Sequence, residues 1–125
     1  MKATNFKELI AWKKAMELTI EVYKLIKLLP IEERFALADQ MRRAAVSIPS
    51  NIAEGHSRTS TKEYLHFLSI ARGSKSELET QLYICVELNY LNRSFIEKSL
   101  LLIDEIGRLT FSYINEIGKS NPPKP

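Results

Sequence analysis

The sequence predicts an all-α protein, folded as an antiparallel up-down-up-down four-helix bundle. Apolar residues recur at every third and fourth position along four long segments, which is the period of one buried helical face. No segment has the alternation of apolar and polar residues that is typical of a strand. Only four glycines and five prolines occur in 125 residues, so we expect long helices joined by short connections.

Composition places the chain among ordinary soluble domains. Hydrophobic residues make up 45% and charged residues 26%, and the length suits one domain, which we assign to residues 5–118. The single cysteine, Cys85, excludes an intramolecular disulfide, and no signal-peptide or membrane-spanning pattern is present, so we expect a cytoplasmic protein. Eighteen basic against fifteen acidic residues leave a net charge of +3, which permits nucleic-acid binding without requiring it.

The first helix follows Asn5, a plausible N-cap, and ends before Pro30. It carries two apolar rows on opposite sides. We assign the first row to the core of the bundle; it consists of Phe6, Leu9, Trp12, Met16, Ile20 and Tyr23. We assign the second row to an interface between copies of the chain, with single exposed apolar residues as the alternative; it consists of Leu18, Val22, Leu25 and Leu29.

The second helix opens at Pro30, since proline is tolerated in a first turn. It passes through a second proline, because the three-and-four apolar spacing continues on both sides of Pro49. We expect a kink there and an end at Gly55 in a left-handed C′ conformation. The polar neighbours of the proline either hydrogen-bond the backbone carbonyls freed by the kink and fix its packing, or form a binding site. The residues of this motif are Ser47, Pro49, Asn51, Glu54 and Gly55.

The third helix starts with the capping box Ser60-Thr61-Lys62-Glu63. Gly73 lies in its interior, where glycine is unfavourable, so we expect it to allow a close approach of the Pro49 bend. Lys75 falls on the apolar arc, with Glu54 as its expected partner. Ser74 and Glu77 complete this second part of the structural motif.

The fourth helix is expected from a second capping box at Ser94-Phe95-Ile96-Glu97 to Gly118. Its faces divide cleanly into apolar and polar residues, as a surface helix of a bundle requires. We expect residues 119–125, which contain three prolines, to form a disordered C-terminal tail.

Several motifs together resemble a bacterial family of four-helix-bundle proteins encoded in 23S rRNA intervening sequences. They are the segment from Phe6 to Trp12, the turn from Leu29 to Glu33, the run from Gln40 to Gly55, and the stretch from Gly73 to Glu79. The resemblance implies a homopentameric ring. It also implies kinship with the accessory proteins of diversity-generating retroelements, which are associated with a reverse transcriptase and structured RNA.

Two functions remain open at this stage. The first is a non-enzymatic assembly whose basic surface binds structured RNA such as rRNA, and a ring would multiply a modest patch by avidity. Its candidate contacts, for each of which a solvated surface charge is the alternative, are Lys13, Lys14, Arg42, Arg43, Arg58, Lys62 and Arg72. The alternative is a protein–protein scaffold or accessory subunit that does not bind nucleic acid itself.

An enzyme is the least supported class. The two histidines, His56 and His66, belong to no hydrolase, protease or phosphate-binding motif. Glu54 and Glu77 could pair across two helices, as in di-iron bundles, but the repeated Glu-x-x-His of such bundles is missing because only Glu63 and His66 have that spacing. We therefore expect no catalytic residues, no cofactor and no metal.

Overall fold

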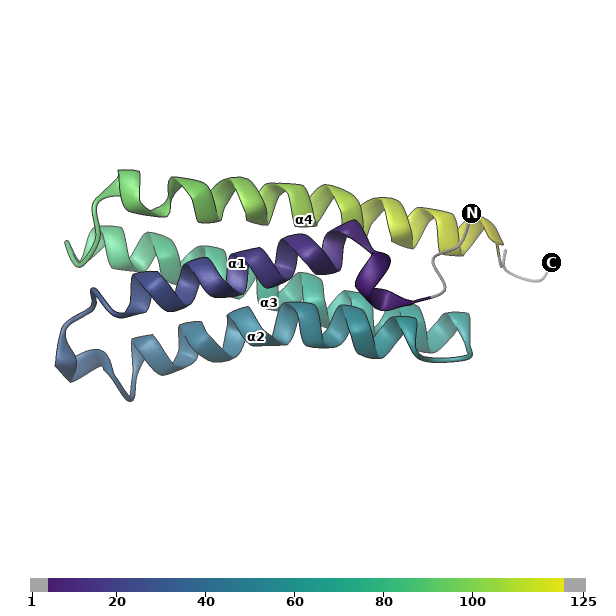
Figure 1. Cartoon of the computed structure of the whole chain (residues 1–125), viewed down its shortest axis with the longest axis horizontal. Helices are drawn as coiled ribbons and strands as arrows, with labels where there is room; N and C mark the ends of the chain where they lie inside the picture. The colour runs from purple at the N-terminus through teal and green to yellow at the C-terminus, as the bar shows by residue number, and fades with distance from the viewer. Residues whose placement is uncertain (1–4, 121–125) are drawn as a thin grey trace.

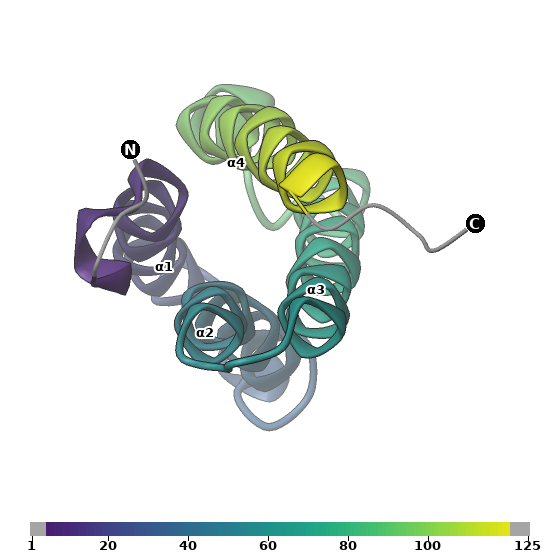
Figure 2. The same cartoon turned by 90° about the vertical axis from the view of Figure 1, so that its right-hand side faces the viewer.

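The computed structural model describes residues 5–120, which form four α-helices and two short 3₁₀ turns and contain no strand. The helices are α1 (Ile10–Ile26), α2 (Leu37–His56), α3 (Thr61–Glu87) and α4 (Arg93–Ser120), with the 3₁₀ turns η1 (Phe6–Glu8) and η2 (Ile31–Glu33). Figure 1 shows the helices side by side with alternating direction, and Figure 2 shows them arranged in the order α1, α2, α3, α4 around the bundle. The predicted antiparallel four-helix bundle is confirmed.

The two apolar rows of α1 exchange part of their predicted roles, while Leu9 and Trp12 of the first row pack against the core as predicted. Leu18 and Val22 are 0% exposed and Leu25 is 5% exposed, so these three residues belong to the core, and Leu29 packs against it. In the other row, Met16, Ile20 and Tyr23 remain at the surface, with exposures of 39%, 56% and 38%. The assignment of Leu18, Val22, Leu25 and Leu29 to a subunit interface is therefore wrong.

A physical reason for this exchange lies in two alanines. Ala11 and Ala15 are both 0% exposed and extend the row of Leu18, Val22 and Leu25 toward the start of α1. Their spacing of four and three continues the helical period, and their small side chains let neighbouring helices approach closely. The buried row of α1 therefore includes these two alanines as well as the leucine and valine positions.

The helix α2 continues through Pro49, as predicted. Proline has no N–H, so the carbonyl of Ala45, four residues earlier, loses its helical donor. The hydroxyl of Thr19 on α1 lies 3.2 Å from that oxygen and 2.8 Å from the carbonyl oxygen of Ala15. Thr19 is only 9% exposed, so a buried group of the neighbouring helix satisfies the freed carbonyl. A bend of the helix axis at Pro49 stays a prediction.

The contact between α2 and α3 is built from small residues. A Cβ atom on Gly55 would lie 2.9 Å from the Cβ of Phe67 and 3.1 Å from Cδ1 of Tyr64, so only glycine fits there. Gly73 faces solvent, with nothing within 4 Å of an added Cβ, so the predicted close approach at Gly73 is wrong. Gly55 is also helical with no positive φ, and α2 ends one residue later, at His56.

The polar motif residues lie along the same contact. The hydroxyl oxygens of Ser47 and Ser74 are 2.7 Å apart and join α2 to α3. The side-chain amide of Asn51 donates to the hydroxyl and the carbonyl oxygens of Ser47, at 2.9 and 2.8 Å. The motif therefore fixes how α2 and α3 pack, which agrees with the structural interpretation of these residues.

The helix ends differ in part from the predictions. Ser60 caps α3, because the backbone N–H of Glu63 donates to its hydroxyl at 3.1 Å. Ser94 is not a cap, since α4 already begins at Arg93. At its other end α4 continues through Gly118 to Ser120, so the predicted end at Gly118 is two residues short. The predicted disordered tail lies, from residue 121 onward, outside the described residues.

One carboxylate joins two connections at the same end of the bundle. Glu33 in η2 accepts a hydrogen bond from the hydroxyl of Tyr90 at 2.8 Å and from the backbone N–H of Leu37 at 3.3 Å. The hydrogen bond to Glu33 raises the pKa of the Tyr90 hydroxyl. Tyr90 directly follows Asn89, whose φ of 62° closes the end of α3 in a left-handed conformation.

Candidate nucleic-acid interface

All seven predicted contact residues reach the surface. Lys13, Arg43, Arg58 and Lys62 are exposed, and Lys14, Arg42 and Arg72 are partly exposed. They come from α1, α2, α3 and the α2–α3 connection, and their recorded partners differ. Within residues 5–120, Arg42 and Arg43 are the two of the seven that pair with the same residue, Asp39.

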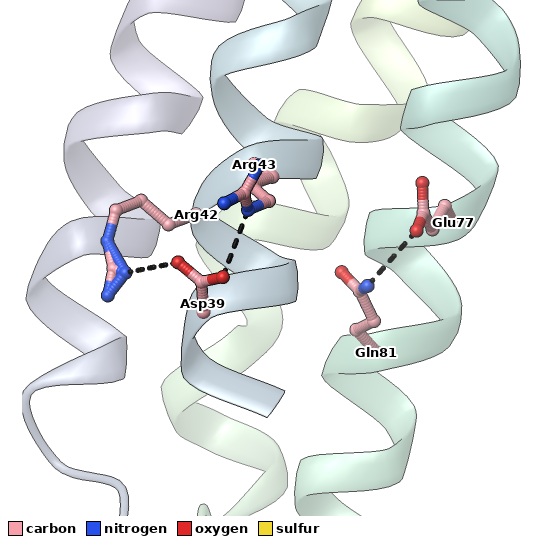
Figure 3. Close-up of polar contacts among 5 residues, drawn as sticks. All are labelled: Asp39, Arg42, Arg43, Glu77 and Gln81. Carbon is pink, nitrogen blue, oxygen red and sulfur yellow. Dashed lines mark hydrogen bonds and ion pairs between the residues drawn. The ribbon is translucent and has the colours of Figure 1, made fainter. Parts of the chain in front are cut away.

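Arg42 and Arg43 both reach the carboxylate of Asp39, one turn earlier on α2. Figure 3 shows the two guanidinium groups on either side of it, at nitrogen–oxygen distances of 3.4 Å for Arg42 and 2.9 Å for Arg43. The side chain of Arg43 is 79% exposed, and exposed ion pairs of this kind contribute little to stability. Both arginines could therefore exchange Asp39 for a phosphate at small cost.

Arg58 is the most extensively paired of the seven. Its guanidinium lies 3.0 Å from a carboxylate oxygen of Glu54 and 3.6 Å from one of Glu63, and it stacks over the ring of Phe67 at 5.0 Å. These contacts hold the α2–α3 connection to the start of α3. Because Glu54 pairs with Arg58 and Lys75 lies over Gly107, the predicted pairing of Glu54 with Lys75 is wrong.

The lysines divide into one paired and two unpaired side chains. Lys14 lies 3.5 Å from the carboxylate of Glu105, which joins α1 to α4. Lys13 and Lys62 are exposed and make no ion pair with any of residues 5–120. Both are free to contact an anion.

Arg72 differs from the other six because its partners are neutral. One terminal nitrogen, Nη1, donates to the carbonyl oxygen of Gly107 at 2.8 Å and to the hydroxyl oxygen of Thr110 at 2.9 Å, both on α4. Its guanidinium carbon also lies 5.9 Å from the centre of the Phe111 ring. The orientation of Arg72 is therefore fixed while its charge stays uncompensated.

The two glutamates that the sequence suggested as a pair, Glu54 and Glu77, do not interact with the same residue. Glu77 accepts a weak 3.5 Å hydrogen bond from Gln81 on the same helix (Figure 3), whereas Glu54 pairs with Arg58, so these two glutamates have separate partners. Within residues 5–120, no three side chains of His, Cys, Asp and Glu are grouped to hold a metal ion.

The one histidine next to a perturbed group is His56. Its Nδ1 lies 3.1 Å from the hydroxyl of Tyr64, whose pKa is raised to about 12 by burial and, to a lesser degree, by Tyr113. Tyr64 therefore stays protonated at neutral pH and cannot act as a base there. The contact joins the end of α2 to α3.

Sequence reasoning missed the roles of three residues that shape this surface or the packing beneath it. Nothing in the sequence indicates that Thr19 contacts the helix that contains Pro49. Lys75 is expected at Glu54 from the sequence, but its side chain lies over Gly107 on α4. A Cβ added to Gly107 would be 3.5 Å from the Nζ of Lys75. Phe111 is 56% exposed next to Arg72, and only its departure from the polar face of α4 could have indicated it.

Along residues 5–120, no helix has the combination of length and apolar character that crossing a bilayer demands.

Comparisons with known proteins identify a family and similar solved structures. The family model described as 23S rRNA-intervening sequence protein matches residues 7–112. Among solved structures, a protein of unknown function from the S23 ribosomal protein family of Bacteroides thetaiotaomicron VPI-5482 is similar, with 27% identity and a TM-score of 0.77. The match covers 84% of this chain and 98% of that one. A search of curated proteins finds no match.

Proposed function

Because the chain belongs to the family of 23S rRNA-intervening sequence proteins, we propose that it is a non-enzymatic, homo-oligomeric, cytoplasmic protein that binds structured RNA. The observation that carries the proposal is that none of the seven predicted contact cations is buried. Phosphate contacts need cations at the surface, where they displace counterions from the nucleic acid. The ion pairs of Arg42, Arg43 and Arg58 are at least partly exposed and exchangeable, and Lys13 and Lys62 need no exchange.

Homo-oligomer formation is supported by the outward row of α1. Met16, Ile20 and Tyr23 follow one another at spacings of four and three, so they lie on one face over two turns of the helix. Each is 38–56% exposed in the single chain. This face replaces the Leu18 row as the proposed interface between copies, and the family resemblance suggests a ring of five. A ring would repeat every surface cation and raise RNA affinity by avidity.

The test of RNA binding is a fluorescence-anisotropy titration of the full chain. A structured rRNA fragment and a DNA duplex of similar length are compared at low and at near-physiological salt. We expect the RNA to bind more tightly than the DNA and to stay bound at the higher salt. Charge reversal by Arg42→Glu and Arg43→Glu should weaken RNA binding and reduce its salt slope, because two phosphate contacts are lost. Loss of all binding at near-physiological salt would contradict the proposal.

The oligomer is tested separately by the mass of the protein in solution. Ile20→Glu should lower the mass while the helix content is retained, because Ile20 is 56% exposed in the single chain. Ser69→Glu, which introduces the same charge at an exposed position of α3, is the control and should leave the mass unchanged. An unchanged mass for Ile20→Glu would exclude this face as the interface.

A specific observation also favours the alternative, a scaffold for a protein partner. The most exposed large apolar side chains, Ile31 at 75% and Phe35 at 86%, lie together in the connection between α1 and α2. Beside them is a hollow of about 360 Å³ whose lining includes Leu29, Pro30 and Arg34. If this surface docks a protein, Phe35→Ser should abolish capture of that protein and leave RNA affinity unchanged.

A further inference from the structure

A second hollow, of about 270 Å³, lies between α3 and α4. Its lining includes Arg72 and Lys75 from α3 and Asp104, Gly107, Arg108 and Phe111 from α4. Of these residues, only Arg72 was expected from the sequence to contact nucleic acid. The hollow brings together three cations and one aromatic ring.

The charge of the hollow is not balanced by its own carboxylate. Asp104 lies 3.7 Å from Arg108, and both side chains are more than 70% exposed, so this pair is weak. Arg72 and Lys75 make no ion pair with any of residues 5–120. Three positive charges therefore face one negative charge, which favours an anionic ligand.

The two unpaired cations are held in place by α4. The hydrogen bonds of Arg72 to Gly107 and Thr110 use Nη1, so Nη2 and Nε keep their donors for another partner. Lys75 extends over the backbone of α4 at Gly107, where an added Cβ would lie 3.5 Å from its Nζ and 3.6 Å from its Cε. The ammonium group of Lys75 therefore lies over α4 and lines the same hollow as Arg72.

Phe111 supplies a different kind of contact. Its side chain is 56% exposed at the edge of the hollow, and the guanidinium of Arg72 lies 5.9 Å from the ring centre. Exposed aromatic rings beside cations are the surfaces on which unpaired nucleic-acid bases stack. A paired base cannot use such a surface, because its faces are covered by its neighbours in the duplex.

We propose that the hollow between α3 and α4 binds one unpaired nucleotide of an RNA, with its phosphate on Arg72 and Lys75 and its base on Phe111. This inference rests on the proposed RNA-binding function and adds to it the part of the RNA that is recognised. It assigns roles to Lys75 and Phe111 that the predicted set of contacts did not contain. It also explains why Arg72 is oriented by neutral groups, which leave its charge available to a phosphate.

The experiment compares two RNAs and four variants by fluorescence anisotropy. One RNA is a hairpin with an unpaired loop, and the other is the same strand fully paired with its complement. Phe111→Leu removes the aromatic ring and keeps an apolar side chain, with Phe95→Leu as the matched control, an exposed phenylalanine elsewhere on α4. Lys75→Gln removes one charge, with the exposed and unpaired Lys24→Gln as its control.

We expect Phe111→Leu to weaken binding of the hairpin about tenfold and to leave binding of the fully paired RNA unchanged, since stacking on one ring is lost. Lys75→Gln should reduce the slope of log affinity against log salt by about 0.7, the value for one single-strand phosphate contact. The two control variants should match the unmodified protein. Thermal unfolding of each variant verifies that the fold is intact.

The other outcomes overturn different parts of the inference. If the unmodified protein binds neither RNA, the proposed function fails and the nucleotide site fails with it. If it binds the hairpin and both hollow variants behave like their controls, RNA binding stands and the hollow is not the site. If Phe111→Leu weakens binding of both RNAs equally, the base does not stack on Phe111, and the assignment of an unpaired nucleotide is wrong.

Discussion

The contact between α2 and α3 and the contact between α3 and α4 differ in what fills them. Between α2 and α3, Gly55 lies against Tyr64 and Phe67 without room for a Cβ, and Ser47 bonds directly to Ser74. Between α3 and α4, Arg72 and Lys75 line an open hollow beside Gly107. The most distinctive motif of the sequence thus serves packing. The unbalanced charge lies along the other contact.

The difference separates two uses of a helix surface. A closely packed contact needs small residues at fixed positions, which makes it specific and intolerant of change. A contact that leaves a hollow can hold long charged side chains whose stems pack on the neighbouring helix. Five predictions test whether the two contacts differ in this way.

The largest effect should appear at Cys85, which reports on closure of the α2–α3 contact. Its sulfur lies 3.6 Å from that of Met41 across the two helices, and burial, with a smaller effect of Glu33, raises the thiol pKa from 9.0 to about 11. At pH 8 the fraction of Cys85 present as thiolate is therefore about a hundredth of that in the unfolded chain. Because iodoacetamide reacts with the thiolate, alkylation should be at least about a hundredfold slower in the folded protein. Equal rates with and without urea would contradict a closed contact.

The same pKa predicts an alkaline loss of stability. The unfolded thiol ionises near its ordinary pKa of 9.0, while the folded thiol resists ionisation until about pH 11. Because the unfolded state loses its proton first, the contribution of this group is complete below pH 9 and declines as the pH rises through 11. Cys85→Ala should flatten this part of a curve of unfolding free energy against pH.

The next largest effect is expected for Gly55→Ala. The added Cβ would lie 2.9 Å from the Cβ of Phe67, so α2 and α3 must shift apart, at a cost of about 1–3 kcal/mol in the free energy of unfolding. Urea denaturation measures this cost. The control is Gly73→Ala, which meets nothing within 4 Å and should not destabilise the protein. Equal changes in the free energy of unfolding at the two glycines would show that Gly55 is packed no more closely than the exposed Gly73.

A smaller loss is expected for Ser74→Ala. It removes the hydrogen bond between the Ser74 and Ser47 hydroxyls, while Asn51 still donates to Ser47, so the cost should be about 1 kcal/mol. Ser69→Ala, at an exposed position of the same helix, is the matched control. If Ser74→Ala lowers the free energy of unfolding no more than Ser69→Ala does, this hydrogen bond does not stabilise the α2–α3 contact.

The smallest effect, with the opposite sign, is expected for Gly107→Ala at the α3–α4 contact. The added Cβ would lie at ordinary contact distance from Lys75, 3.5 Å at the nearest atom. Alanine is the better helix former, so unfolding should require about 0.5 kcal/mol more free energy, measured by urea denaturation. A loss of more than 1 kcal/mol would show that this contact is as closely packed as that between α2 and α3.

Much of the fold was predictable because helical periodicity is local information. The four helices, the cap at Ser60 and the continuity of α2 through Pro49 all follow from residues within a few turns of one another. The candidate cations were also predictable, since charged side chains usually stay at the surface. Their grouping was not, because residues on different helices combine only when the helices are placed.

The sequence by itself therefore determined the helices, their apolar faces and the small residues of the motif. Only the tertiary structure decided which row of α1 turns inward, that Thr19 satisfies the carbonyl freed by Pro49, and that Gly55 rather than Gly73 marks the close approach. It also decided that Lys75 lies beside Arg72 rather than at Glu54. The physical reason is that periodicity orients side chains around one helix axis, whereas packing against distant segments sets the direction in which each face points.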